Sequence, residues 1–183
     1  NVDDIHTAIN ENKKIKFKYY KWDINKKLVP RHNGDWFVVS PWALTWDDEN
    51  YYMVAFDDLD QQIKHYRVDK MMRLSVEVEK RAGKDAFKNF DMAEYSKSTF
   101  GMYQGKKTRV KIEFANYMCG VFIDRFGKDI TFRPIDDEHS ELHVDVNVSR
   151  QFFGWIFSLG KDVKVTGPSE VVEEMKEAAK EFL

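Results

Sequence analysis

The stretch HYRVDKM, residues 65–71, carries three side chains at alternate positions that can bind anions or exchange protons. Because the side chains of an extended strand alternate between its two faces, His65, Arg67 and Asp69 are expected in one row. The guanidinium of Arg67 could bind a phosphate or a carboxylate through two parallel hydrogen bonds. It could equally form a closed ion pair with Asp69. From the residues alone both interpretations stay open.

Further cations and tyrosines extend this candidate row. The stretch IKFKYY alternates, which directs Lys16, Lys18 and Tyr20 to the face opposite its apolar side chains. A single lysine on a strand is usually solvated, and an aromatic residue on a strand belongs to the core more often than to a site. Tyrosines beside cations, including Tyr51 and Tyr52, nevertheless suit the stacking of nucleobases and the binding of phosphates.

The elements that must position these residues are short strands joined by tight turns. The pattern predicts a helix with Ile5 and Ile9 on one face, followed by strands at 15–20, 35–44, 51–56, 62–68 and 73–79. Pro41 is expected to end or bend the second strand. Short strands at this spacing favour a small, strongly bent antiparallel sheet or barrel.

Residues 81–107 differ in character from the strands before them. They are rich in lysine, glycine and serine and show no sustained alternation. We predict a linker there, with a short helix around Met92–Tyr103. This linker divides the chain into a first domain at 1–80 and a second domain at 108–183.

The last part of the chain contains a near-repeat of strand, helix, glycine and strand. One half is RVKIEF, NYMCGVFIDRF, GKD and ITF, and the other is ELHVDVNV, SRQFFGWIFSL, GKD and VKV. Asn116 and Ser149 are the expected helix N-caps, and Gly127 and Gly160 the glycines that end the helices. Two such halves predict a ferredoxin-like βαββαβ domain, so the fold class is α+β. A closing helix is expected after Gly167-Pro168.

The second helix of this domain has more apolar surface than one sheet can cover. Its large side chains are Phe152, Phe153, Trp155, Ile156 and Phe157. Five such residues in six positions surround much of a helix. We expect the surplus to face the closing helix or a second subunit, and we predict a homodimer.

Composition narrows the classes of function. The net charge of −2 argues against a general polyanion binder, although eight Lys or Arg residues and one acid lie between Lys13 and Arg31. Six acids and no base lie between Asp47 and Asp60, which allows a basic patch beside an acidic hairpin. The single Cys119 excludes an internal disulfide and a thiolate zinc site, and it fits a reducing cytoplasm.

The sequence contains no motif for catalysis or for a cofactor. No glycine-rich phosphate loop or nucleophile motif occurs, and no segment is long and apolar enough to span a membrane. His139 and His143 lie four apart among acids, where a solvated turn is a far better interpretation than a metal site. We predict no enzymatic activity, no metal and no cofactor.

Four segments follow one another in the order and spacing of a known family. They are IKFKYY, Pro41 with Ala43-Leu44, Tyr51-Tyr52-Met53 before VAFD, and HYRVDKM. They resemble the signature segments of the WYL domain, a small Sm/SH3-like β-barrel of bacterial transcriptional regulators. Tyr51 and Met53 stand where the name motif has tryptophan and leucine. Residues 108–183 resemble the C-terminal extension that often follows this domain, including WIFSLG at Trp155–Gly160.

The resemblance implies the ligand-sensing and dimerising part of a cytoplasmic regulator. Promoter DNA would be bound by a winged helix-turn-helix whose sequence would precede Asn1. Arg67 matches the family's signature arginine, and the effector is expected to be nucleotide-like or a single-stranded nucleic acid. The predicted ligand-binding residues are Arg67, His65, Tyr52, Lys18, Tyr20 and Lys64. The alternative is a structural assembly module without a small-molecule ligand, and a phosphate-processing enzyme ranks last.

Overall fold

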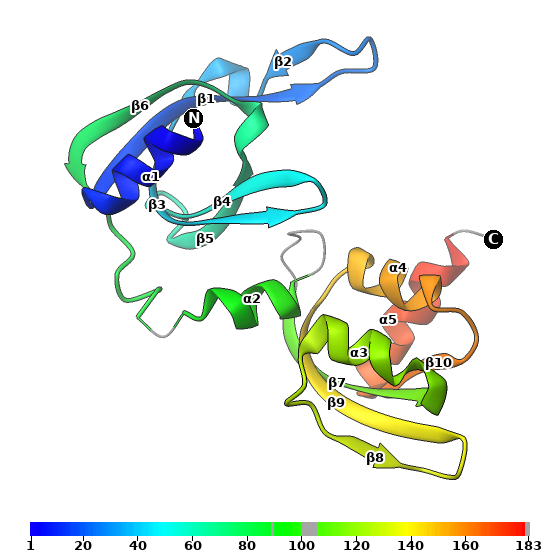
Figure 1. The fold of residues 1–183 in the computed structure, drawn as a ribbon. Helices are drawn as coiled ribbons and strands as arrows, with labels where there is room; N and C mark the ends of the chain where they lie inside the picture. The colour runs from blue at the N-terminus through cyan, green and yellow to red at the C-terminus, as the bar shows by residue number, and fades with distance from the viewer. Residues whose placement is uncertain (89, 100–105, 182–183) are drawn as a thin grey trace. The chain divides into compact units, whose positions relative to one another are not determined.

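A computed structural model describes residues 1–88, 90–99 and 106–181 of the chain. The chain forms two compact units, Asn1–Asp91 and Met92–Leu183, each with its own hydrophobic core (Figure 1). Both units combine helices with an antiparallel sheet, which confirms the predicted α+β class. Within the described residues no helix has the length and apolar character needed to cross a membrane.

The first unit is a small, strongly bent antiparallel barrel, as predicted. Its elements are α1 (Val2–Asn10), β1 (Lys13–Trp22), β2 (Leu28–Pro30), β3 (Trp36–Asp47), β4 (Asn50–Asp57), β5 (Gln62–Arg67) and β6 (Met71–Lys80). The strands follow the order β2-β1-β3-β4-β5, and β6 pairs with β1. β3 continues through Pro41, but its register with β4 shifts between Pro41 and Ala43, so the proline bends the strand and does not end it.

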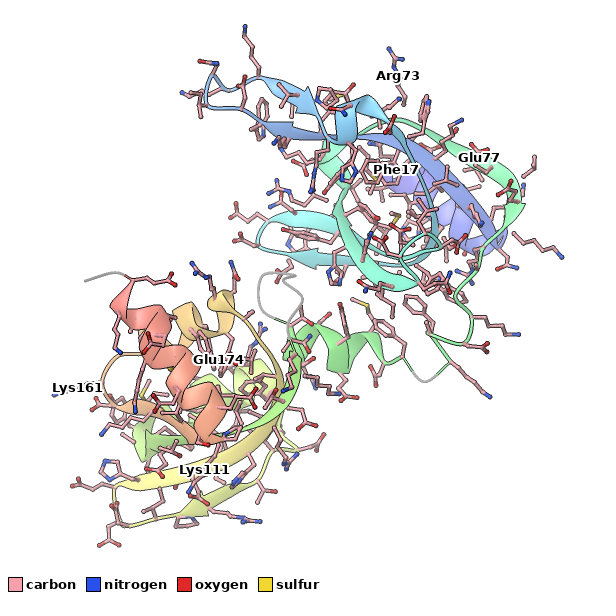
Figure 2. The ribbon with its side chains drawn as sticks, turned by 180° about the vertical axis from the view of Figure 1, so that it is seen from behind. Phe17, Arg73, Glu77, Lys111, Lys161 and Glu174 are labelled. Carbon is pink, nitrogen blue, oxygen red and sulfur yellow. The ribbon has the colours of Figure 1, made fainter. Side chains whose placement is uncertain are left out.

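Alternation along β1 builds the core of this barrel. Ile15, Phe17 and Tyr19 are at most 8% exposed, whereas the lysines between them face outward. Ile5 of α1 packs into the same core, and Figure 2 shows Phe17 within the curve of the barrel. Burying one such large apolar side chain contributes about 1.5–3 kcal/mol. The inward row of β1 therefore fixes which side chains are left on its outer face.

Two features of the first unit were not predicted. The end of β1 forms a hairpin with β2 that extends away from the barrel (Figure 1). The chain after β6, part of the predicted linker, packs back on the barrel. There the ring of Phe87 stacks on Trp42 at 4.8 Å, and Trp42 Nε1 donates to the carbonyl of Ala82 at 2.8 Å.

The second unit has the predicted ferredoxin-like topology. Its elements are α2 (Met92–Ser98), β7 (Lys106–Ala115), α3 (Cys119–Phe126), β8 (Phe132–Pro134), β9 (His139–Val148), α4 (Arg150–Ser158), β10 (Val163–Gly167) and α5 (Ser169–Lys180). The strand order β10-β7-β9-β8 is that of a split βαβ pair, with all neighbours antiparallel. α2 is the predicted short helix, whose expected last turn at 100–103 lies outside the described residues.

The ends of the helices test the predicted caps. Ser149 Oγ accepts from the Phe152 amide at 3.2 Å, and Gly127 and Gly160 have positive φ where α3 and α4 end. These three predictions are confirmed. The prediction for Asn116 is wrong, because a 3-10 turn at Asn116–Met118 comes before α3. The side-chain Nδ2 of Asn116 donates instead to the carbonyl of Asp137 at 3.0 Å.

Candidate effector site

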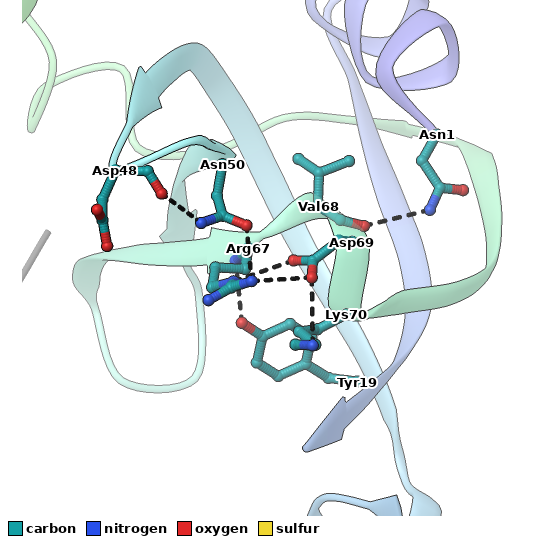
Figure 3. Close-up of polar contacts among 8 residues, drawn as sticks. All are labelled: Asn1, Tyr19, Asp48, Asn50, Arg67, Val68, Asp69 and Lys70. Carbon is teal, nitrogen blue, oxygen red and sulfur yellow. Dashed lines mark hydrogen bonds and ion pairs between the residues drawn. The ribbon is translucent and has the colours of Figure 1, made fainter. Parts of the chain in front are cut away.

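Arg67 is the last residue of β5, and its guanidinium donates hydrogen bonds to two side chains, Asp69 and Asn50. Nε donates to Asp69 Oδ1 at 3.0 Å, and Nη2 donates to Asp69 Oδ2 at 2.9 Å. Nη2 also donates to Asn50 Oδ1 at 2.6 Å (Figure 3). The strand ends before Asp69, but a 3-10 turn at Val68–Lys70 returns this carboxylate to the guanidinium. Arg67 therefore already binds a carboxylate through two parallel bonds.

This ion pair is charged and open to solvent. The hydrogen bond with Arg67 holds the pKa of the Asp69 carboxyl below its usual range, and the same bond raises the pKa of Arg67. The side chains of Arg67 and Asp69 are 36% and 46% exposed. An exposed pair of this kind contributes only about 0–1 kcal/mol to stability. A ligand anion could therefore replace Asp69 at small cost.

The backbone around this pair is fixed more firmly than the pair itself. Tyr66 and Val68, on either side of Arg67, are buried in the barrel core. The amide of Arg67 donates to the hydroxyl of Tyr19 at 2.9 Å. The side-chain Nδ2 of Asn1 donates to the carbonyl of Val68 at 3.3 Å (Figure 3). It also donates to the carbonyl of Met71 at 2.9 Å. The turn that carries Asp69 is therefore held at both ends.

Three of the predicted ligand-binding residues share one face of the β4–β5 hairpin. Tyr52 is the cross-strand partner of Arg67, and His65 is the partner of Val54. Arg67 and His65 are alternate residues of β5, and Tyr52 and Val54 are alternate residues of β4, so all four project to the same side. The structure therefore groups a guanidinium, an imidazole and a phenol.

Lys18 and Tyr20 lie elsewhere, on the outer face of β1. Lys18 Nζ lies 4.4 Å from the centroid of the Trp36 ring and donates to the carbonyl of Gly34. Tyr20 pairs with Pro30 in the β1–β2 hairpin. Neither side chain makes a hydrogen bond with Arg67 in the part of the chain that the structure describes. Lys18 and Tyr20 thus belong to a second surface.

Lys64 is bound to carboxylates at one end of the barrel. Its ammonium contacts Asp57 Oδ2 at 2.7 Å and also Asp60. Burial would lower the pKa of Lys64, but its hydrogen bonds to these two carboxylates raise it overall. Lys64 is the residue before His65 on β5, so the two side chains point to opposite faces. It does not join the group around Arg67.

Other residues near Arg67 were missed by the sequence analysis. Asn50 was treated only as part of a turn, although its amide oxygen accepts from the guanidinium. Lys70 Nζ lies 3.2 Å from Asp69 Oδ2 and 4.6 Å from the Trp22 ring. The guanidinium of Arg31 lies 5.5 Å from the ring of Tyr19. The many cations between Lys13 and Arg31 could have indicated Arg31 as a candidate. Lys70 could have been found because it lies within the stretch HYRVDKM itself.

The geometry around Arg67 suits the binding of an anion. Within the described residues no group of three or more His, Cys, Asp or Glu side chains could hold a metal ion. Arg67 and Lys70 contact the exposed carboxylate of Asp69, Arg31 lies against the ring of Tyr19, and a phenol stands across the hairpin from Arg67. Such a group can bind an anion and place a planar ring beside it.

Comparisons with known proteins agree with the two units. A family model described as WYL domain matches residues 1–76, and one described as WCX domain matches residues 106–183. No curated protein matches the chain.

Solved structures are similar at low identity. Proteasome accessory factor B/C of Arthrobacter aurescens is 16% identical, with 98% of this chain and 26% of that chain covered and a TM-score of 0.39. A CRISPR Cas-related protein is 16% identical, with 98% of this chain and 50% of that chain covered and a TM-score of 0.52. This chain thus spans half or less of the length of these structures, and the second likeness concerns the fold alone.

Proposed function

Because this chain belongs to the WYL-domain regulator family, with a WCX domain after its WYL domain, we propose that it senses a ligand for a transcriptional regulator. The effector is a negatively charged, nucleotide-like molecule or single-stranded nucleic acid, bound at Arg67 with His65 and Tyr52 beside it. The second unit supports a homodimer. Promoter DNA is bound through a separate domain, the protein acts in the cytoplasm, and the chain itself catalyses no reaction.

The observation that carries this proposal is the exposed ion pair between Arg67 and Asp69. The guanidinium is already oriented for two parallel bonds by Asn50 and by the backbone beneath it. Asp69 is an internal anion that costs about 0–1 kcal/mol to displace. A phosphate bound through charge-assisted bonds contributes about 1.5–3 kcal/mol, so it replaces Asp69 with a net gain.

The test is a titration of the chain with nucleoside monophosphates, together with a melting curve. Arg67→Ala should weaken binding about ten- to a hundredfold and change the melting temperature little. Arg67→Lys should recover only part of the affinity, since an ammonium lacks the planar fork. Asp69→Ala is the matched control. It removes the other half of the same ion pair and should leave binding unchanged or strengthen it.

A second candidate function is an assembly module without a ligand. The observation in its favour is that the fork of Arg67 is already satisfied by Asp69 and Asn50. In that case the parent chain binds no nucleotide, and Arg67→Ala and Asp69→Ala lower the melting temperature by similar amounts. Equal losses of stability in a parent that binds nothing would reject the sensing proposal.

A further inference from the structure

The edge of the sheet in the second unit is only partly covered. β8 is the edge strand beside β9, and its pairing runs from Phe132 opposite Leu142 to Pro134 opposite Ser140 (Figure 1). In the described ranges no strand pairs with this edge of β9 beyond Leu142. β9 continues to Val148, so its second half has a neighbouring strand, β7, on one side only.

The hydrogen-bond pattern shows which backbone groups this edge leaves open. The amide of Ile135 donates to the carbonyl of His139 at 2.9 Å, so these two residues form a hydrogen-bonded pair. Bonded and non-bonded pairs alternate along an antiparallel ladder, so the odd-numbered residues of β9 direct their backbone groups toward the β8 side. Pro134, which has no N–H, agrees with this pattern because it lies opposite Ser140. The amide of Asp145 therefore points to the open edge, where the described part of the chain gives it no ladder partner.

A cavity of about 540 Å³ lies along this open edge. It is lined by His143 and Asp145 of β9, by the loop between α3 and β8, and by α2. Asn147 Nδ2 donates to Thr99 Oγ1 at 2.9 Å, and both side chains are buried, which fixes the chain after α2 against β9. The open stretch, residues 143–146, spans about 13 Å at about 3.3 Å per residue, which fits an extended segment of about four residues.

The two sides of this edge differ in character. His143 of β9 and Arg133 of β8 stand on the outer face of the sheet, because the residue before each of them packs into the core. On the side that the helices cover, the cavity is lined by Phe126 and Ile130, which pack into the same core. The side chains of an added strand would alternate between these two faces. The edge therefore suits a segment in which polar and apolar residues alternate.

Positive charge predominates among the unpaired groups of the cavity. Lys97 of α2 and Arg133 both line it, and neither forms an ion pair in the described ranges. Two acids of the lining already form ion pairs, at 2.9 and 3.4 Å: Glu94 with Lys107, and Asp145 with Arg109. Asp129 is the remaining acid of the lining. The polar residues of a bound segment are therefore expected to be acidic.

We infer that this edge of β9 binds an extended segment of a partner protein in which acidic and apolar residues alternate. The segment adds a strand beside β9, with main-chain hydrogen bonds to Asp145. Its acidic side chains contact Arg133, with Lys97 adding positive charge, and its apolar side chains pack on Phe126. The site lies wholly in the second unit and does not depend on the proposed effector site at Arg67.

A second copy of the chain is the competing occupant, because residues 76–79 of β6 read VEVE. β6 is already paired with β1, and Lys14 Nζ lies 3.7 Å from Glu79 Oε2. Val76 packs against the core of the barrel, whereas Val78 is 90% exposed. β6 therefore offers the cavity one apolar side chain of this stretch, and a free segment of a partner offers two.

The first experiment measures amide hydrogen exchange in the whole chain without a partner, resolved by residue with NMR. The amide of Asp145 should exchange at least about a hundredfold faster than those of Val144 and Val146, which the ladder with β7 protects. Equal protection of all three amides would mean that the edge is closed, and it would overturn the inference.

The second experiment titrates a labelled peptide against the whole chain by fluorescence polarisation. The peptide has about five residues, valine and glutamate in alternation, and is blocked at both ends. A peptide of the same composition with its valines and glutamates in two blocks should bind at least about tenfold more weakly. Two further peptides are N-methylated at one of two successive central amides. One of them should bind about two- to tenfold more weakly and the other normally, because only alternate N–H groups point to β9.

The charges of the cavity are tested by substitution. Arg133→Ala should weaken the binding of the alternating peptide about tenfold. Asp129→Asn should strengthen it, because a carboxylate that repels the glutamates is removed. Lys128→Ala, at an exposed lysine next to Asp129 that does not line the cavity, is the matched control and should leave binding unchanged. Circular dichroism checks that each variant is folded.

Three other outcomes overturn the inference. The first is no binding of the alternating peptide at about 1 mM, the weakest affinity that the titration detects. The second is binding that salt abolishes and that depends neither on alternation nor on N-methylation, which is attraction of charge alone. The third is protection of the Asp145 amide in a dimer that Glu77→Lys dissociates, which assigns the edge to β6 of a second copy. None of these results bears on Arg67→Ala, so the proposed function is tested separately.

Discussion

Tyr66 lies in the core of the barrel and shows how a single buried group links the stability of the fold to pH. Its hydroxyl donates to Asp57 Oδ2 at 3.3 Å, and its side chain is directly beside Arg67 in the chain. Burial, followed by the charge of Asp57, raises the pKa of Tyr66 above its ordinary value of about 10. The unfolded chain therefore loses this proton first as the pH rises. The contribution of Tyr66 to the free energy of unfolding is therefore fully present below about pH 10 and decreases as the pH rises above it.

We predict that Tyr66→Phe makes the chain less sensitive to alkaline pH. The variant loses one hydrogen bond, which costs about 0.5–1.5 kcal/mol at pH 7. Between about pH 8 and 11, however, its free energy of unfolding should fall less than that of the parent. Urea unfolding followed by fluorescence measures both effects. Tyr51→Phe, at a tyrosine that is 45% exposed, is the control and should follow the parent; an equal fall for Tyr66→Phe would contradict the assignment.

At the residue scale, alternation in the sequence predicted part of the site. It placed Arg67 and Asp69 close enough to pair, because only Val68 separates them in the chain. It could not predict Asn50, which reaches Arg67 only because the β4–β5 register sets Tyr52 opposite Arg67. That register depends on the turn between two strands and on packing inside the barrel. Contacts between distant residues thus need information that a local pattern lacks.

At the scale of elements, the segment after β6 stabilises the barrel from outside. Gly83 has a φ of +83°, and a Cβ atom there would lie 2.6 Å from the Cβ of Phe56. Phe56 is 7% exposed. The glycine is therefore needed both for its backbone angle and for the close approach of the chain to β4. This packing explains why the predicted linker does not begin as a free segment.

We predict that Gly83→Ala is more costly than the same change at Gly160. Both glycines have a φ of +83°, but nothing lies within 4 Å of a Cβ at Gly160. Gly160→Ala should cost about 1–2 kcal/mol for the backbone angle alone. Gly83→Ala should cost a further 1–3 kcal/mol, roughly, for the clash with Phe56. Chemical denaturation compares the two variants, and equal losses would mean that Phe56 moves aside freely.

Helix ends were predicted correctly where a local sequence pattern alone determines the structure. Ser149 caps α4 because its hydroxyl has only to reach the amide three residues on. Asn116 has the same cap preference, but its side chain is used between β7 and the β8–β9 turn, where it bonds to Asp137 and Ser140. The β1–β2 hairpin was missed because its second strand has only three residues. The structure at such positions is determined by tertiary contacts, which cannot be read from a single sequence.

At the scale of the whole molecule, α4 bears on the predicted dimer. Phe152, Phe153 and Ile156 are at most 5% exposed, and the ring of Trp155 packs edge-on against Phe122 and Phe126. Only Phe157 remains 47% exposed among the five apolar residues of this helix. It lines a hollow of about 110 Å³ together with Phe153, Gly154 and Ala178. The surplus apolar surface is thus smaller than the sequence suggested.

We predict that the chain is a dimer and that Phe157→Ser weakens it. An aromatic side chain at the centre of an interface typically contributes enough for a tenfold or larger change in Kd, about 1.4 kcal/mol. Sedimentation velocity at micromolar concentration measures the change. Ile135→Ser, at a residue that is 48% exposed in the same unit, is the matched control and should not alter the dimer. A parent that sediments only as a monomer would contradict the prediction.

The way the barrel is closed has a consequence for α1. In the described part of the chain β5 and β6 pair with other strands and not with each other, and the turn between them carries Asp69. The carbonyls of Val68 and Met71 on this turn are bonded by Asn1, the residue that precedes α1. We expect that a ligand displacing Asp69 from Arg67 would shift this turn. The two hydrogen bonds of Asn1 would then couple the position of α1 to the occupancy of Arg67.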